Sequence, residues 1–101
     1  MMSRSIFYKL GGPDGHTPVE TDLVELTPHE KRQVGFDKVG GVEIRTVFLS
    51  IDHSFGDGPP VVFETTIFGG KHDEYHKRYC TWTEAKAGHK KAVAMVAKEA
   101  R

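Results

Sequence analysis

At the centre of the sequence stands VEIRTVFLSID, residues 42–52, which is rich in β-branched and aromatic residues. In an extended chain, successive side chains alternate between two faces. One face carries Val42, Ile44, Thr46 and Phe48, and the other carries Val47, Leu49 and Ile51. Both faces are apolar from Thr46 onward, which is typical of a strand that is covered on both sides or that lies at a dimer contact.

Two further strands are predicted after this one. Residues 61–68 are β-branched and aromatic almost throughout, and Gly69-Gly70 ends the run. The segment from Asp52 to Pro60 contains two glycines and two prolines, so we expect an ordered loop that closes a hairpin. Residues 75–81 alternate as well and predict a third strand, either central or at an edge.

A C-terminal helix is predicted from Trp82 to about Glu99. Thr81 and Glu84 form a capping box, in which each side chain satisfies a backbone donor of the first turn. One stripe of the helix is apolar apart from a histidine: Trp82, Ala85, His89, Ala92, Val93, Val96 and Ala100. Gly88 costs about 1 kcal/mol relative to alanine inside a helix, which predicts that another backbone approaches closely at this position.

The N-terminal part of the chain is less regular. Residues 4–10 alternate as a strand, residues 11–15 form a glycine- and proline-containing turn, and Pro18 limits any return strand to a short edge strand. Between Glu20 and Gly41, the run from Thr27 to Glu30 has the residues of a helix start. The following residues, 31–35, offer little apolar surface, so we expect at most one or two helical turns, or a polar loop.

These elements predict an α+β fold, with a small antiparallel sheet of three to four strands packed against one C-terminal helix. At 101 residues the chain has the size of a single domain, residues 1–101. Fourteen basic and fourteen acidic residues give zero net charge, which argues against nucleic acid as a partner. A lone cysteine, Cys80, excludes an intramolecular disulfide, and the first ten residues lack an apolar run. We therefore expect a cytoplasmic protein without membrane contact.

Two groups of residues suggest catalysis but have simpler explanations. His72 and His76 have the spacing of a zinc-binding pair on a helix, yet Asp73 stands where that pattern needs glutamate. In an extended segment the two histidines lie roughly 13 Å apart, too far for one ion. Cys80 and His76 could pair as nucleophile and base, but no third group orients the histidine. His89 is most simply a hydrogen-bonded histidine in the helix stripe.

Two functions from different classes remain open. In the first, the chain is a non-enzymatic binding or adaptor protein that binds a protein partner and uses no metal or cofactor. Its contact residues are those of the loop and the helix start: Asp52, His53, Phe55, Asp57 and Trp82. The alternative is a small metal-dependent hydrolase that uses Asp52, His53 and Glu64, with His89 as a further member. A homodimer is expected through the strand at 42–52 or through an open sheet edge.

Several short motifs are shared with one family. They are Thr46-Val47-Phe48-Leu49, Asp52-His53-Ser54-Phe55, Gly58-Pro59-Pro60, Phe63-Glu64-Thr65, Phe68-Gly69-Gly70, Arg78-Tyr79, Thr81-Trp82, Glu84-Ala85 and Gly88-His89. Phe7-Tyr8 and the run from Asp14 to Val19 also fit. On these residues, over half of the chain, the sequence resembles a family of small uncharacterised proteins encoded by bacteriophages and bacterial genomes. The resemblance implies a phage or mobile-element context and no activity or cofactor. The polar stretch 26–38 departs from the tryptophan-rich segment of that family.

Overall fold

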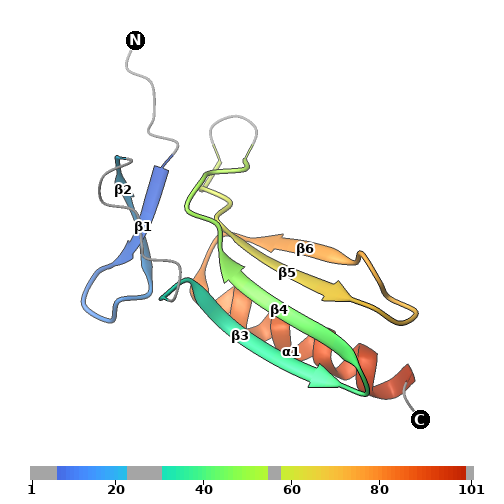
Figure 1. The fold of residues 1–101 in the computed structure, drawn as a ribbon. Helices are drawn as coiled ribbons and strands as arrows, with labels where there is room; N and C mark the ends of the chain where they lie inside the picture. Colours follow the sequence, from blue (N-terminus) through green and yellow to red (C-terminus); the bar gives the residue numbers. More distant parts are fainter. Residues whose placement is uncertain (1–6, 23–30, 55–57, 100–101) are drawn as a thin grey trace.

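The computed structural model describes residues 7–22, 31–54 and 58–99, and within them the chain has an α+β fold (Figure 1). Its elements in chain order are β1 (Phe7–Gly11), β2 (Thr17–Thr21), β3 (Gln33–Val39), β4 (Val42–Phe48), β5 (Phe63–Phe68), β6 (His76–Tyr79) and α1 (Trp82–Glu99). β1 and β2 form a two-stranded hairpin, and β3-β4-β5-β6 form an antiparallel sheet in that order. The predicted fold class is therefore confirmed.

Strand β4 organises the four-stranded sheet. It pairs with β3 on one side and with β5 on the other, and Thr46 lies directly opposite Thr65 of β5. The turn between β3 and β4 consists of Gly40 and Gly41, with φ angles of 53° and 88°. A type I′ turn, which is common in two-residue hairpins, requires positive φ at both central residues. Glycine adopts positive φ without steric cost.

Helix α1 covers one face of this sheet and creates the core. Fully or almost fully buried side chains come from every strand of the sheet and from the helix: Val34, Ile44, Phe48, Phe63, Ile67, Tyr79, Ala85, Ala92 and Val96. At the start of the helix, the backbone N–H of Glu84 donates to Thr81 Oγ1 at 3.1 Å, and Thr81 N–H donates to Glu84 Oε1 at 3.1 Å. The predicted capping box and the predicted helix are both confirmed.

The N-terminal hairpin is attached beside the sheet. Its turn is held by Asp14, whose Oδ1 accepts the backbone N–H of His16 at 2.8 Å. This hydrogen bond lowers the pKa of the Asp14 carboxyl. Tyr8 of β1 attaches the hairpin to the chain segment that follows β4. Its side chain is buried, and its N–H donates to the carbonyl of Ser50 at 2.7 Å. The short second strand expected because of Pro18 is present as β2.

The sequence prediction was wrong for part of the segment between Glu20 and Gly41. Where helical turns or a loop were expected at residues 31–35, strand β3 begins at Gln33 and continues to Val39. A few apolar side chains are enough to stabilise strand β3, because only one of its faces is buried and because β4 supplies its backbone hydrogen-bond partners. The helix start expected at Thr27 to Glu30 lies outside the described residues.

Three other expectations need correction. The central strand ends at Phe48 and not at Asp52, because Ser50 has a φ of 69° and the chain turns there. Ile51 then forms a single bridge to Phe7. The second face of β4 is also not covered by α1, so its apolar residues do not mark a strand buried on both sides. At Gly88 the close neighbour is the side chain of Tyr79, where the sequence had predicted another backbone.

Candidate binding surface

The loop predicted to be the contact surface is fixed at its base by Asp52. Its Oδ1 accepts the backbone N–H of Ser54 at 2.8 Å and that of Val61 at 2.9 Å, while His53 N–H donates to the Val61 carbonyl at 2.9 Å. The Asp52 carboxylate thus caps the loop. Phe55 and Asp57 lie outside the described residues.

Trp82, the other predicted contact residue, is half-buried and used largely for packing. Its ring stacks on the imidazole of His16, with 3.7 Å between centroids and 3° between planes. Its other ring contact is edge-to-face with Phe63, at 6.3 Å. The indole therefore joins the N-terminal hairpin to the start of α1 and to the core.

The residues proposed for metal-dependent hydrolysis do not meet at one point. Glu64 lies on the sheet face that points away from α1, where it accepts a hydrogen bond from Arg78 Nε at 2.8 Å. His89 lies on the opposite face, under the helix. Residues 7–22, 31–54 and 58–99 contain no group of three histidine, cysteine or acidic side chains arranged to hold a metal ion. His72 lies in the turn before β6 and His76 within β6, so they do not share a helix.

Cys80 does not have the environment of a reactive thiol. Burial raises its pKa, and the carboxylates of Glu84 and Asp52 raise it further. Its Sγ lies 4.0 Å from the carbonyl oxygen of Pro59, which brings the end of the loop beside the start of the helix. A nucleophilic cysteine needs the opposite shift, toward the thiolate.

A chain of hydrogen bonds runs through the interface between the sheet and the helix. His89 Nε2 contacts Asp37 Oδ2 at 2.7 Å, and His89 Nδ1 contacts Thr46 Oγ1 at 2.7 Å. Thr46 Oγ1 is in turn 2.5 Å from Thr65 Oγ1, which accepts the hydroxyl of Tyr79 at 3.1 Å. One residue from each of β3, β4, β5 and β6 therefore joins a network centred on the helix histidine.

The order acid–histidine–hydroxyl in Asp37, His89 and Thr46 matches that of a nucleophilic triad. Thr46 and Thr65 are both 0% exposed, however, so a substrate has no access to either hydroxyl in this fold. The tautomer of His89 with its proton on Nε2 satisfies every member: Nε2–H donates to Asp37 and Nδ1 accepts from Thr46. We therefore assign the network to the specification of the core and not to catalysis.

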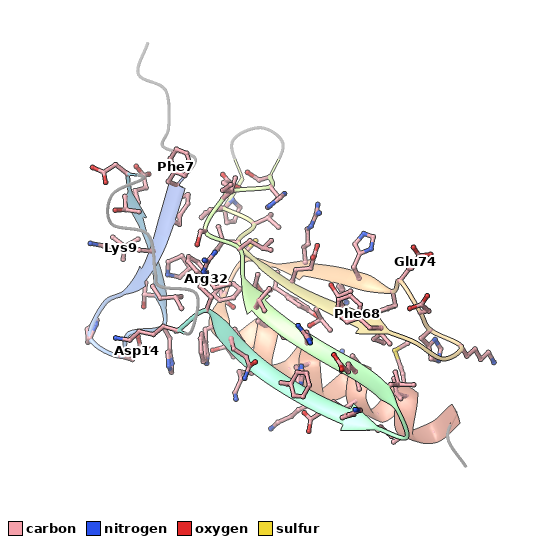
Figure 2. The ribbon with its side chains drawn as sticks, viewed as in Figure 1. Phe7, Lys9, Asp14, Arg32, Phe68 and Glu74 are labelled. Atoms are coloured by element: carbon pink, nitrogen blue, oxygen red, sulfur yellow. The ribbon has the colours of Figure 1, made fainter. Side chains whose placement is uncertain are left out.

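The face of the sheet opposite α1 is open. Among the described residues no helix or strand packs on it, and Figure 2 is viewed from this side, with Phe68 labelled. Its centre is Arg45, whose guanidinium carbon lies 5.3 Å from the ring centroid of Phe36 and 5.6 Å from that of Phe68. Phe36 is 42% and Phe68 48% exposed. We call these three residues, from β3, β4 and β5, the Phe–Arg–Phe cluster.

A neighbouring carboxylate, that of Glu43, binds the arginine of the cluster. Glu43 Oε1 accepts hydrogen bonds from Arg45 Nη2 at 2.8 Å and from Arg45 Nε at 3.2 Å. Because Arg45 is held by a carboxylate and by two rings at once, less side-chain entropy is lost when a partner contacts it. The open face thus presents an aromatic and cationic centre, with the carboxylate of Glu43 beside it.

The sequence prediction did not identify this cluster, because it did not identify β3. One signal was available: Val34, Phe36 and Lys38 alternate with other residues up to Gly40-Gly41, and a second alternating run begins at Val42. Two glycines between two such runs are typical of a tight hairpin. That hairpin would have placed Phe36 beside Arg45, its partner in the observed register.

Comparison with protein-family models, with curated proteins and with solved structures gives no match. The resemblance to phage and bacterial proteins therefore stays a prediction. Within the described part of the chain, no helix has both the length and the apolar content needed to cross a membrane.

Proposed function

We propose that this chain is a non-enzymatic protein-binding module whose contact surface is the open face of the four-stranded sheet. The observation that carries the proposal is the Phe–Arg–Phe cluster: two half-exposed phenylalanines hold an arginine at the centre of an uncovered sheet. Aromatic residues and arginine are the types most enriched among the residues that dominate protein interfaces.

The energetics support a partner on this face. Covering the exposed half of each phenylalanine ring contributes about 1 kcal/mol per ring, at the usual value for apolar burial. Arg45 keeps its ion pair with Glu43 in the process, so the guanidinium is not left buried without a counter-ion. Affinity then depends on how well the partner's shape fits the cluster and not on net charge, which is zero for the chain.

The loop from Asp52 to Pro60 stays a second proposed contact region. Its anchored base supports this proposal, because a loop fixed at both ends loses less entropy on binding. Phe55 can be tested separately from the cluster, because it belongs to none of the strands that carry the cluster.

Quantitative affinity capture from source-cell extract tests the proposal when four forms are compared side by side. These are the parent, a Phe36→Ser/Phe68→Ser variant, a Phe55→Ala variant and a Lys90→Ala control. Lys90 is exposed on α1, on the other side of the molecule from the open face. All forms are first checked for unchanged circular dichroism and thermal midpoint.

We expect a partner that is enriched by the parent and by Lys90→Ala and lost with the double serine variant. Loss with Phe55→Ala alone would assign the contact to the loop. Equal capture by all four forms, or no specific capture by the parent, would contradict binding through the open face.

A further inference from the structure

Strand β6 is a free edge of the sheet. Among the described strands it pairs with β5 only, at the margin of the sheet opposite β3 (Figure 1). Ile67 N–H donates to the Tyr75 carbonyl at 3.0 Å, and the register pairs Thr65 with Lys77. Because hydrogen-bonding residues alternate along an antiparallel strand, the backbone groups of Lys77 point toward β5. Those of His76 and Arg78 then point outward and are available to another strand.

A groove lies beside this edge, between β6 and α1. It has a volume of about 340 Å³, and its lining includes Lys77, Tyr79, Cys80, Ala87, Gly88 and Lys91. On the helix side of the groove Ala87 has a small side chain, and Tyr79 fills the space beside Gly88. An edge strand with an adjacent groove is the arrangement that binds extended peptides by strand addition.

The charges around the groove are mainly basic. Lys77 and Arg78 are exposed residues of β6 that line the groove, and Lys91 is an exposed lining residue of α1. Of these three, only Arg78 has a carboxylate partner among the residues that the structure describes: Glu64, on the open face.

The lining contains one acidic side chain, Glu84, which also caps the helix. Its Oε1 accepts the N–H groups of Thr81 at 3.1 Å and of Cys80 at 3.2 Å. The lining thus holds three basic side chains, Lys77, Arg78 and Lys91, against one carboxylate, and this excess favours a negatively charged segment.

A second copy of the chain suits the sheet edges β6 and β3 less well than a negatively charged segment suits β6. Pairing β6 with another β6 would bring basic side chains together, which is unfavourable across strands. The other edge, β3, carries a register irregularity between Gln33 and Gly35 and a charged side chain, Asp37, on the face that packs on α1. Bulges and inward-facing charges are devices that protect edge strands from pairing.

We propose that the β6 edge and its groove bind an extended acidic peptide segment of a partner protein, which adds to the sheet as a fifth strand. The peptide backbone pairs with the outward groups of His76 and Arg78. Alternate peptide side chains enter the groove, where carboxylates reach Lys77 and Lys91. This site is separate from the Phe–Arg–Phe cluster and does not depend on it.

The test uses fluorescein-labelled peptides of about eight residues, the length of a short strand. One alternates glutamate with valine, one alternates lysine with valine, and a single-stranded oligothymidylate of similar length serves as a non-peptide polyanion. Binding is followed by fluorescence anisotropy, and backbone amide shifts of the ¹⁵N-labelled protein locate the site. The protein forms are the parent, Lys77→Glu/Lys91→Glu, His76→Pro, His76→Ala and Arg45→Ala.

We expect the acidic peptide to bind and to shift the amides of β6 and of the facing turns of α1. The double glutamate variant should weaken binding by at least about tenfold. His76→Pro removes one outward N–H without removing a bond to β5, so it should weaken binding, whereas His76→Ala and Arg45→Ala should not. Unchanged circular dichroism shows that each variant is folded.

Three results would overturn the proposal. The first is the absence of binding of the acidic peptide to the parent. The second is equally tight binding of the oligothymidylate, which would indicate a general polyanion surface. The third is an equal loss with Arg45→Ala, which would move the peptide to the open face. Loss of partner capture by the Phe36→Ser/Phe68→Ser variant, tested separately, leaves this outcome unaffected, so the two proposals fail independently.

Discussion

His89 Nε2 lies 2.7 Å from Asp37 Oδ2, which ties the middle of helix α1 to the edge strand β3. The two residues are far apart in the sequence, and only the histidine was identified as structurally relevant from the sequence alone. Asp37 is more than half exposed whereas His89 is buried, so the pair joins the solvent boundary to the interior hydrogen-bond network. The ring of His89 also packs on Gly35, where a Cβ atom would lie 2.9 Å from its Cδ2.

Thr46→Val should destabilise the protein although it preserves the side-chain volume. The substitution leaves His89 Nδ1 without its donor in a buried site, which costs about 1–3 kcal/mol. Thr66→Val is the matched control, because this threonine lies on the open face and its change should stay within about 0.5 kcal/mol. Urea unfolding measures both. Equal stabilities for the two variants would show that the network contributes nothing.

Gly88→Ala should also lower the stability of the protein, although alanine has a higher helix propensity than glycine. The new Cβ would overlap the hydroxyl oxygen and ring carbons of Tyr79. We expect a net loss of about 1–3 kcal/mol, typical of overpacking. Ala87→Gly, one residue earlier on an exposed position, isolates the propensity effect and should cost about 1 kcal/mol. A stabilised Gly88→Ala protein in thermal unfolding would contradict the close approach of Tyr79.

His16→Ala should loosen the N-terminal hairpin without unfolding the sheet. The stacked contact with Trp82 is lost, and with it a ring contact between the hairpin and α1. Since Trp82 is the only tryptophan, its emission reports this contact directly. We expect a changed emission maximum and faster amide exchange in β1 and β2, with exchange in β4 and β5 unchanged. An unaltered spectrum would show that the rings do not stack in solution.

The thiol of Cys80 should react slowly in the native protein. Burial and the nearby carboxylates of Glu84 and Asp52 raise its pKa, so the thiolate fraction at neutral pH is smaller than in an unfolded chain. Iodoacetamide labelling followed by mass spectrometry should be slower in buffer than in urea. Faster labelling of the folded form would indicate an activated thiol and would support the hypothesis that Cys80 is a nucleophile.

Stability should fall at alkaline pH, and Tyr79 should be one cause. Burial raises the pKa of its hydroxyl, the hydrogen bond with Thr65 acts in the opposite direction, and Tyr75 raises the pKa slightly further. In the unfolded chain a tyrosine ionises near pH 10. The unfolded state therefore releases its proton first, so this contribution is complete below about pH 10 and is lost as the pH rises through the folded pKa. In urea unfolding between pH 9 and 11, Tyr79→Phe should show a smaller decline than the parent. An equal decline would exclude Tyr79 as a cause.

The sequence was informative wherever a local signal coincided with the final environment. Thr81 and Glu84 specify the start of α1 through contacts within one turn, so the helix could be predicted from its residues. The alternation at β4 and β5 was similarly clear, because buried and exposed positions follow period two. Strand β3 was missed because its stability comes from pairing with β4 and not from its own composition.

For the site, the sequence by itself determined the elements that carry it: a central apolar strand, a capped C-terminal helix with His89 in its apolar stripe, and an ordered loop from Asp52 to Pro60. Each of these follows from neighbours a few residues apart. Only the tertiary structure decided that Asp37, Thr46, Thr65 and Tyr79 meet around His89 and that Phe68 joins Phe36 beside Arg45. Such contacts depend on strand order and register, which bring together residues distant in the chain. Local sequence patterns do not encode those long-range choices.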